Sequence, residues 1–170
     1  KRFKNNLGEK GENTFDQIEK FKSTGLYFIN QTSYTSGLLF RYGVRYDENR
    51  IGTDSEDFIS LNKFNPSLGV SYSISDSDNI YFSTGTSFET PTLNELSDNP
   101  NGKGLNKNLD PSSSVNYEIG WRKTTSNLMF EAIAYLINTD NEILPYELEQ
   151  FPGKNFYRNV GSTRRYGIEL

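Results

Sequence analysis

Histidine and cysteine are both absent from this chain of 170 residues. Without them the chain has no thiolate nucleophile, imidazole base, disulfide framework or zinc finger. Positive charge is also scarce, since 18 Lys and Arg residues stand against 22 Asp and Glu residues, a net charge of -4. A nucleic-acid surface requires clustered cations that contact phosphates. We therefore expect no nucleic-acid partner.

Long hydrophobic runs are missing as well. The longest purely apolar run covers residues 132–137, whereas a membrane-spanning helix needs about 20 residues. Only 34% of the residues are hydrophobic, and 14% of all residues are aromatic, a balance that favours many β-strands with one polar face. The chain begins at Lys1 without an initiator Met and ends at Leu170 within an alternating run. We interpret it as a piece of a longer protein.

Alternation of polar and apolar residues is the dominant pattern. Successive side chains of a strand point to opposite faces, so this pattern predicts strands with one apolar and one polar face. Four runs show this pattern clearly, and three less regular runs, at residues 26–34, 80–88 and 128–138, also indicate strands; residues 128–138 are apolar on both faces apart from Glu131. Most of these seven runs are longer than the usual strand of about 5 to 6 residues. They cover residues 26–34, 38–47, 64–75, 80–88, 115–122, 128–138 and 159–170.

The connections between these runs are alternately short and long. Residues 35–37, 76–79 and 124–127 form short connections, and residues 50–62, 89–113 and 141–155 form long ones. In an up-and-down sheet, alternate connections lie at opposite ends, so one end carries tight turns and the other carries long polar loops. Outer-membrane barrels show this asymmetry together with strands of about 10 residues. The sequence predicts an all-β, antiparallel up-and-down meander of about seven strands, an open segment of a large transmembrane β-barrel.

Residues 1–23 differ from the rest because they are highly charged. We expect a solvated loop or a single short helix here, with Thr14 as the N-cap and Gln17 completing a capping box. We assign the barrel segment to residues 24–170.

Six short motifs occur in a fixed order along this segment. They are Gly-Val-Arg-Tyr-Asp at 43–47, Asn-Pro-Ser-Leu-Gly at 65–69, Phe-Glu-Thr-Pro-Thr-Leu-Asn-Glu-Leu at 88–96, Asn-Lys-Asn-Leu-Asp-Pro at 106–111, Tyr-Glu-Ile-Gly at 117–120, and Tyr-Arg-Asn-Val-Gly at 157–161 followed by Gly-Ile-Glu at 167–169. In this order they resemble the barrel of TonB-dependent outer-membrane receptors. One departure is Ser112, where the family usually carries Glu.

The resemblance implies a location in the bacterial outer membrane and contact with its lipid. It implies that the whole protein imports a scarce nutrient, such as a ferric siderophore, haem or cobalamin, with energy passed from TonB. The plug domain and the TonB box lie outside this chain, and the segment would supply loops and lumen wall without chemistry or a cofactor. A passive porin remains an alternative. A soluble ligand-binding β-sandwich is a second one, and it would bury its apolar faces between two sheets.

Candidate binding residues fall into two groups. One group lies on polar strand faces that would line the lumen, and it could contact the plug or an anionic ligand, or form only a hydrated wall. The other lies in the 89–113 loop, which we expect outside the cell in ligand capture or closure, with an ordinary polar loop as the alternative. The first group is Arg41, Arg45, Glu118, Arg122, Arg165 and Glu169; the second is Glu89, Thr90, Asn94, Lys103 and Lys107.

Two further patterns lead to weaker hypotheses. Oxygen ligands at residues 54–57 could hold Ca²⁺, but the EF-hand spacing is missing, so solvated loop polarity is favoured. Aromatic residues near strand ends could form interfacial girdles, because amphipathic rings favour the membrane–water boundary, or they could be ordinary sheet packing. These residues are Tyr46, Phe64, Tyr72, Phe88, Tyr135 and Tyr157.

Overall fold

The computed structural model describes residues 2–4, 15–54, 58–101 and 104–170. Its main feature is one antiparallel sheet with the strand order β11-β8-β7-β6-β5-β4-β3. The strands are β3 (Glu19–Ser33), β4 (Leu38–Thr53), β5 (Ile59–Ser73), β6 (Asp78–Glu89), β7 (Ser112–Thr124), β8 (Met129–Asp140) and β11 (Ser162–Glu169). Neighbours in the sequence are therefore neighbours in the sheet, except that the chain makes an excursion between β8 and β11. The predicted meander of seven long strands is confirmed.

The remaining elements lie outside this sheet. β1 (Arg2–Lys4) pairs with β2 (Phe15–Gln17), and β9 (Ile143–Glu147) pairs with β10 (Asn155–Asn159). In the described part of the chain one short helix, α1 (Leu93–Ser97), follows β6. Within the described residues, no helix is both long and apolar enough to cross a membrane.

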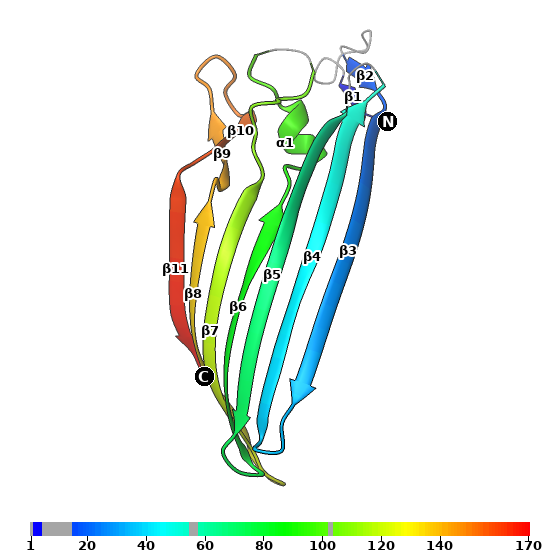
Figure 1. Cartoon of the computed structure of the whole chain (residues 1–170). Helices are drawn as coiled ribbons and strands as arrows, with labels where there is room; N and C mark the ends of the chain where they lie inside the picture. Colours follow the sequence, from blue (N-terminus) through cyan, green and yellow to red (C-terminus); the bar gives the residue numbers. More distant parts are fainter. Residues whose placement is uncertain (1, 5–14, 55–57, 102–103) are drawn as a thin grey trace.

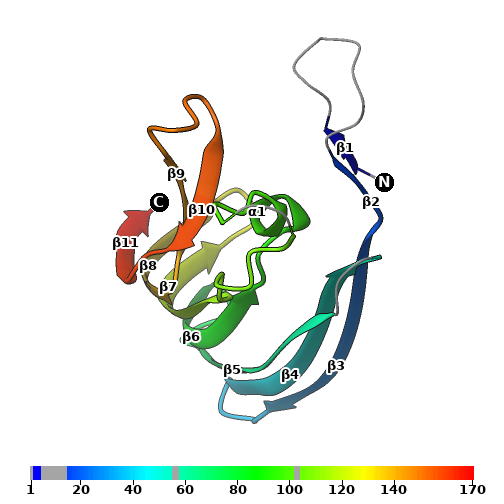
Figure 2. The same cartoon turned by 90° about the horizontal axis from the view of Figure 1, so that it is seen from above.

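The sheet is curved, and its two edges do not meet. Seen from above, the strands form an open arc from β11 to β3, with α1 and the β9–β10 hairpin on its inner side (Figure 2). Among the described strands, β3 and β11 each have one neighbour in this sheet. The structure is thus a segment of barrel wall, and the two packed sheets of a β-sandwich are not seen in the described part.

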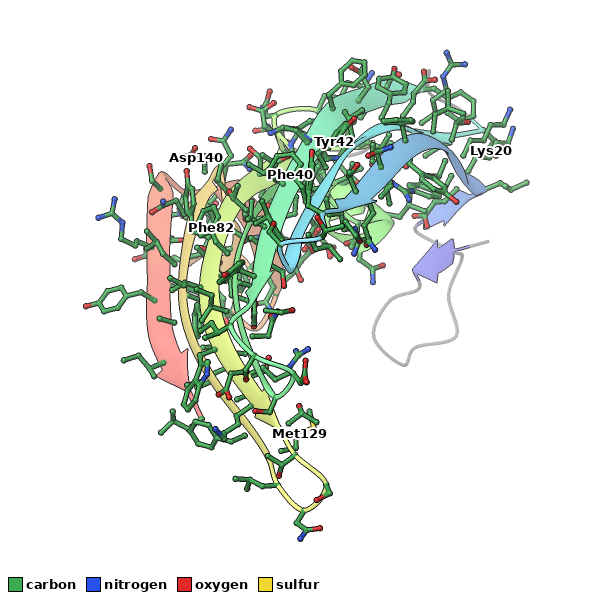
Figure 3. All side chains as sticks on the ribbon, turned by 60° about the horizontal axis from the view of Figure 1, so that its bottom comes forward. Lys20, Phe40, Tyr42, Phe82, Met129 and Asp140 are labelled. Atoms are coloured by element: carbon green, nitrogen blue, oxygen red, sulfur yellow. The ribbon has the colours of Figure 1, made fainter. Side chains whose placement is uncertain are left out.

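The two faces of the arc differ sharply in composition. Cross-strand partners share a face, and one row of such partners runs through Phe40, Val70, Phe82, Ile119, Ala134 and Ile168. We call this side the convex face; Phe40, Tyr42 and Phe82 are labelled on the strands that carry it in Figure 3. Its side chains remain largely uncovered, with Ile119 at 59% and Ile168 at 77% exposure. An uncovered apolar face is what the barrel interpretation predicts and the sandwich excludes.

Tight turns join the strands at one end of the sheet, which we call the turn end (bottom of Figure 1). In the β3–β4 turn the Tyr34 amide donates to the Leu38 carbonyl at 2.8 Å, and the Ser73 amide donates to the Gly37 carbonyl at 3.0 Å. Gly37 has φ of 79°, and a Cβ there would lie 3.1 Å from the Ser73 carbonyl oxygen. The turn therefore requires glycine at this position.

At the opposite end of the sheet, which we call the loop end, the structure corrects three sequence-based expectations. The 50–62 connection is mostly strand, because β4 and β5 remain paired up to Ile51 and Ile59. Asn159, expected at the start of the last alternating run, belongs to β10 and not to the last strand of the main sheet. A solvated loop or a short helix was expected at residues 1–23, and neither describes residues 15–17 and 19–23, which belong to β2 and to the start of β3; Thr14, the N-cap of the helix alternative, lies outside the described residues.

The only buried apolar cluster of the described residues lies at the loop end, on the concave face. It consists of Ile51 from β4 and Leu96, Leu105 and Leu109 from the β6–β7 loop. Elsewhere the sheet is held by its backbone ladders, which are long between β3, β4 and β5 and between β6, β7 and β8, and shorter between β5 and β6, where only Ser67–Ser73 of β5 pair. The loop end thus has a small core of its own, and the wall has none.

Candidate functional site

The concave face of the sheet carries most of the charged side chains predicted from the sequence. Register places Arg41, Glu118 and Tyr135 in one row, separated by Gly69 and Ser83. The same face carries Ile51, against which the loop core packs. All six predicted wall residues lie on this face, and their binding role stays a prediction: Arg41, Arg45, Glu118, Arg122, Arg165 and Glu169.

Near the turn end, Arg122 and Glu131 form a closed polar cluster. They are cross-strand partners of β7 and β8, with 2.6 Å between Arg122 Nη2 and Glu131 Oε1. Tyr81 donates its hydroxyl to the same Glu131 oxygen at 3.3 Å, and the Arg122 guanidinium lies 5.9 Å from the centre of the Tyr81 ring. The ring covers Gly120, where a Cβ would be 2.3 Å from it. These groups satisfy one another, so we interpret them as wall structure.

A second closed cluster lies on β4 and β5. Arg45 Nε is 2.7 Å from Asp47 Oδ1, two residues along the same face. The Asn65 amide donates to the other Asp47 oxygen at 3.3 Å, and the Thr86 hydroxyl donates to Asn65 Oδ1 at 3.3 Å. Arg45 is therefore engaged within the wall.

Between β6 and β11 the concave face is hollowed by a pocket of about 510 Å³. Glu118, Arg165 and Glu169 lie in its lining together with Tyr135. The Tyr135 ring covers Gly167, where a Cβ would be 2.7 Å from the phenol oxygen. The pocket therefore combines one aromatic surface with charges of both signs, a lining suited to a polar ligand with an apolar part.

A smaller pocket of about 160 Å³ lies further toward the loop end and is mostly polar. Glu89 from the end of β6, Glu142 from the β8–β9 connection and Arg165 from β11 line it. Arg165 donates to Glu142 and also lines the larger pocket. The two pockets thus share one side chain, which links the loop end to the wall.

The β6–β7 loop folds inward over the concave face. Thr92 caps α1: its hydroxyl accepts from the Glu95 amide at 3.3 Å, while the Glu95 carboxylate accepts from the Thr92 amide at 2.7 Å. This capping box fixes the direction of the helix. Leu96 is then directed into the loop core, where its exposure is 1%. The described part of this polar loop is held against the sheet because it buries its own leucines.

Asn159 joins this loop to the neighbouring one. Its side-chain amide donates to the carbonyls of Asp110 and Asn141, both at 2.8 Å, and its carbonyl oxygen accepts from the Asp110 amide at 2.8 Å. Sequence reasoning noted the Tyr-Arg-Asn-Val-Gly motif but placed this residue on a strand of the main sheet. The amide instead connects three segments of the loop end.

The predicted loop residues occupy different surroundings. Glu89 lines the smaller pocket. Thr90 is half-buried, Asn94 and Lys107 are exposed, and Lys103 lies outside the described residues. The structure therefore places Glu89 beside Glu142 and Arg165 in one pocket. It does not bring the five predicted loop residues together in a single site. Sequence reasoning missed Glu142, since a single acidic residue after a strand gives no signal of its contacts.

Other sequence-based hypotheses are partly corrected. Tyr46 and Phe64 stack on the convex face with ring centres 4.8 Å apart, and Tyr72 and Phe88 lie on the same face. Tyr135 is wrong as a girdle residue because it lies on the concave face, and Tyr157 packs against the loop core. Of the suggested Ca²⁺ ligands, Asp54 accepts from the Ile18 amide at 3.0 Å, and residues 55–57 lie outside the described residues.

The contact between Glu142 and Arg165 leads to a pH prediction. The Thr163 hydroxyl and the Arg165 guanidinium hold the pKa of the Glu142 carboxyl below its ordinary value. A carboxyl whose pKa is lower in the folded than in the unfolded state stabilises the fold at pH values above its unfolded pKa. This stabilisation is lost as the pH falls through the folded pKa. We expect exchange of the Val160 amide, which donates to the Glu142 carbonyl at 2.8 Å, to accelerate below about pH 4.

Hydrogen exchange of the complete protein in detergent at a series of pH values measures this effect. Glu142→Gln is the control, because it keeps the shape of the side chain and removes the titration. After correction for intrinsic exchange, the variant should show fast exchange at neutral pH and no further acid-dependent change. Equal acid dependence in both proteins would contradict a role for this carboxyl.

Comparison with known proteins gives one family model that spans nearly the whole chain. The model, described as TonB dependent receptor-like, beta-barrel, matches residues 2–170. Among curated proteins, the vitamin B12 transporter BtuB of Vibrio vulnificus (strain CMCP6) is 32% identical over 81 residues, which is 48% of this chain and 12% of BtuB. The chain therefore spans a small part of this relative.

Solved structures give the same result for the fold. The copper transporter OprC matches with a TM-score of 0.77 and 17% identity over 89% of this chain and 25% of OprC. The FrpB iron transporter of Neisseria meningitidis (F3-3 variant) matches with a TM-score of 0.72 and 16% identity over 91% of this chain and 24% of FrpB. At these identities the likeness shows the fold, and the chain corresponds to about a quarter of each structure.

Proposed function

Because the chain belongs to the family of TonB-dependent receptor β-barrels, we propose that it forms wall and extracellular loops of a receptor that imports a scarce nutrient with TonB-derived energy. The family consists of bacterial outer-membrane transporters and receptors and not of enzymes. The observation that carries the proposal is the position of the ordered β6–β7 loop, which folds over the concave face beside a polar pocket lined by Glu89, Glu142 and Arg165.

The relatives support a metal complex or metallated cofactor as the nutrient. Their names refer to vitamin B12 (BtuB), copper (OprC) and iron (FrpB), and a further neighbour is the alcaligin receptor FauA of Bordetella pertussis. A double mutant of the haemophore receptor HasR of Serratia marcescens was solved in complex with its haemophore HasA and haem. We propose a ferric siderophore, haem or a similar complex for this protein.

In this proposal the two faces have separate roles. The convex face contacts lipid, and the concave face lines the lumen, where it contacts the plug of the complete protein. Along β4 the apolar side chains run from Leu38 to Tyr46, roughly 27 Å at 3.4 Å per residue. With a strand tilt of about 40°, this corresponds to a height of roughly 21 Å, close to the band of about 25 Å in outer-membrane barrels. The sheet thus fits the bilayer.

Transport by the complete receptor tests the proposal. Cells that lack their own receptors would express it and be supplied with radiolabelled ferric siderophores, haem and cobalamin, with and without TonB. We expect accumulation of one of these compounds only when TonB is present. Accumulation that is independent of TonB would identify a passive porin and contradict the proposal.

The proposed topology makes a separate prediction. Asn101 is exposed in the β6–β7 loop, and Asp76 is exposed in the turn between β5 and β6. Because the chain has no cysteine, Asn101→Cys and Asp76→Cys introduce single thiols at opposite ends of the sheet. In intact cells an impermeant maleimide should label position 101 and leave position 76 unlabelled, and both should react after lysis. The reverse pattern would show that the loop end faces the periplasm.

A further inference from the structure

The convex face changes character where β3, β4 and β5 approach the loop end. Apolar rows, formed by Phe28 with Val44 and by Leu26 with Tyr46 and Phe64, give way to a polar row that contains Glu48. The next row pairs Lys22 directly with Arg50. Further toward the loop end, Lys20 is exposed on the same face; Figure 3 marks it at the start of β3.

The apolar part of this region is hollowed into a groove of about 370 Å³. Leu26, Phe28 and Phe64 are more than half exposed, at 68%, 57% and 65%. The groove is lined by Leu26, Tyr27, Phe28, Val44, Tyr46 and Phe64. Its lining is almost free of polar atoms, so it suits a hydrocarbon chain.

The cations on the loop-end side of the groove destabilise the sheet. Like charges directly opposite each other on neighbouring strands are destabilising, and Lys22 and Arg50 are such a pair. Glu48 accepts from Arg50 Nε at 3.0 Å and so neutralises part of this charge. Lys22 lies 5.6 Å from the centre of the Phe58 ring. Three successive rows of this face therefore carry three cations and one carboxylate, in a chain that is acidic as a whole.

From this arrangement we propose that the convex face of β3–β5 binds a lipid with an anionic phosphate headgroup, and this inference rests on the proposed function. The acyl chain would lie in the aromatic groove, and the phosphate would contact Lys22 and Arg50. The row of these cations is four residues beyond the Tyr46 row, roughly 14 Å along the strand and about 10 Å in height at the usual tilt.

The height of the cation row above the Tyr46 row is compatible with the headgroup region of a bilayer. The headgroup region adds about 5 to 7 Å on each side of the hydrocarbon core. Long cationic side chains reach back toward this level while their stems follow apolar surface. A phosphate above the groove is therefore within reach of both cations, and charge complementarity favours a lipid with a net negative headgroup over a zwitterionic one.

Lipid retention by the complete receptor tests the proposal. The purified receptor would be reconstituted in vesicles of phosphatidylcholine with a minor fraction of phosphatidic acid, extracted gently, and its bound lipids counted by native mass spectrometry. We expect preferential retention of phosphatidic acid. In Lys22→Gln/Arg50→Gln this preference should fall by about tenfold or more, since each cation near a membrane surface strengthens the attraction of anionic lipid.

Two control variants sharpen the result. Lys22→Arg/Arg50→Lys keeps both charges and should keep the preference. Lys63→Gln/Arg158→Gln removes the same charge from the concave face of β5 and from β10, and it should also keep the preference. The neutral pair Lys22→Gln/Arg50→Gln is expected to fold, because it removes a like-charge contact.

Several results would overturn the inference. An unchanged preference in Lys22→Gln/Arg50→Gln, or an equal loss in Lys63→Gln/Arg158→Gln, would show that this face is not the site. Displacement of the lipid by millimolar inorganic phosphate would indicate a site for free phosphate, and a receptor dimer that depends on Lys22 and Arg50 would indicate a second copy as the occupant. Absence of the preference in the unaltered receptor, with intact TonB-dependent uptake, refutes this inference alone, whereas the wrong maleimide pattern refutes the proposed topology.

Discussion

Leu68→Arg is expected to lower the folding stability of the complete receptor in vesicles by about 2 to 4 kcal/mol, the cost of a cation on the lipid face near the bilayer midplane. Leu68 lies in the central row of the apolar band on β5, between Tyr42 and Thr84. The stability is measured by urea titration of folding into phosphatidylcholine vesicles, with heat-modifiable gel mobility as the readout of folded barrel.

The matched control is Ser67→Arg, one residue along the same strand. Ser67 is exposed on the concave face, and its cross-strand partners are Gly43 and Gly85, which leave room for a long side chain. Ser71 is less suitable because it exchanges hydrogen bonds with Asn79. We expect Ser67→Arg to change stability by less than about 1 kcal/mol, the range of surface substitutions. Equal losses in the two variants would contradict the assignment of the faces.

The second large effect is expected at the loop core. Leu96→Ala should destabilise the loop end by about 2 to 5 kcal/mol, because truncation of a buried leucine removes apolar contacts and leaves a cavity. Leu96 packs with Ile51, Leu105 and Leu109 and has 1% exposure. The strands do not depend on this core, so the barrel should still fold while the loop becomes sensitive to protease.

Limited proteolysis in intact cells and binding of the transported ligand measure the consequence. Leu128→Ala in the β7–β8 turn is the control, since this leucine is 54% exposed and its loss should leave both readouts unchanged. If the loop takes part in capture, Leu96→Ala should weaken ligand binding and also make the loop more sensitive to protease. A nicked loop with undiminished binding would remove the loop from the proposed mechanism.

Local periodicity was a reliable guide to the wall. The alternation at residues 38–47 and 115–122 predicted strands with the correct faces. In any strand successive side chains point to opposite faces, and this does not depend on how the sheet curves. The short connection expected at residues 35–37 likewise lies between β3 and β4. Where the alternation stopped, at residues 50–62, the prediction of a loop was wrong, since the cross-strand ladder continues through polar residues.

Contacts of the charged side chains could be predicted only in part. Arg122 and Glu131 flank the short β7–β8 turn symmetrically, so register alone could have paired them. Arg165 and Glu142 lie on either side of the β9–β10 hairpin, whose presence was not predicted, and no local pattern brings them together. The helix alternative before residue 24 is not seen in the described residues for a related reason: local apolar spacing was outweighed by pairing of β3 with β4.

By itself the sequence determined the strands of the wall, their two faces and the separation of tight turns from long loops, because each of these depends on residues close together in the chain. Only the tertiary structure decided that the β6–β7 loop folds inward onto Ile51, that Asn159 joins Asp110 to Asn141, and that Lys22 stands opposite Arg50. These contacts depend on register and on the curvature of the sheet, which are properties of the assembled strands and not of any one segment.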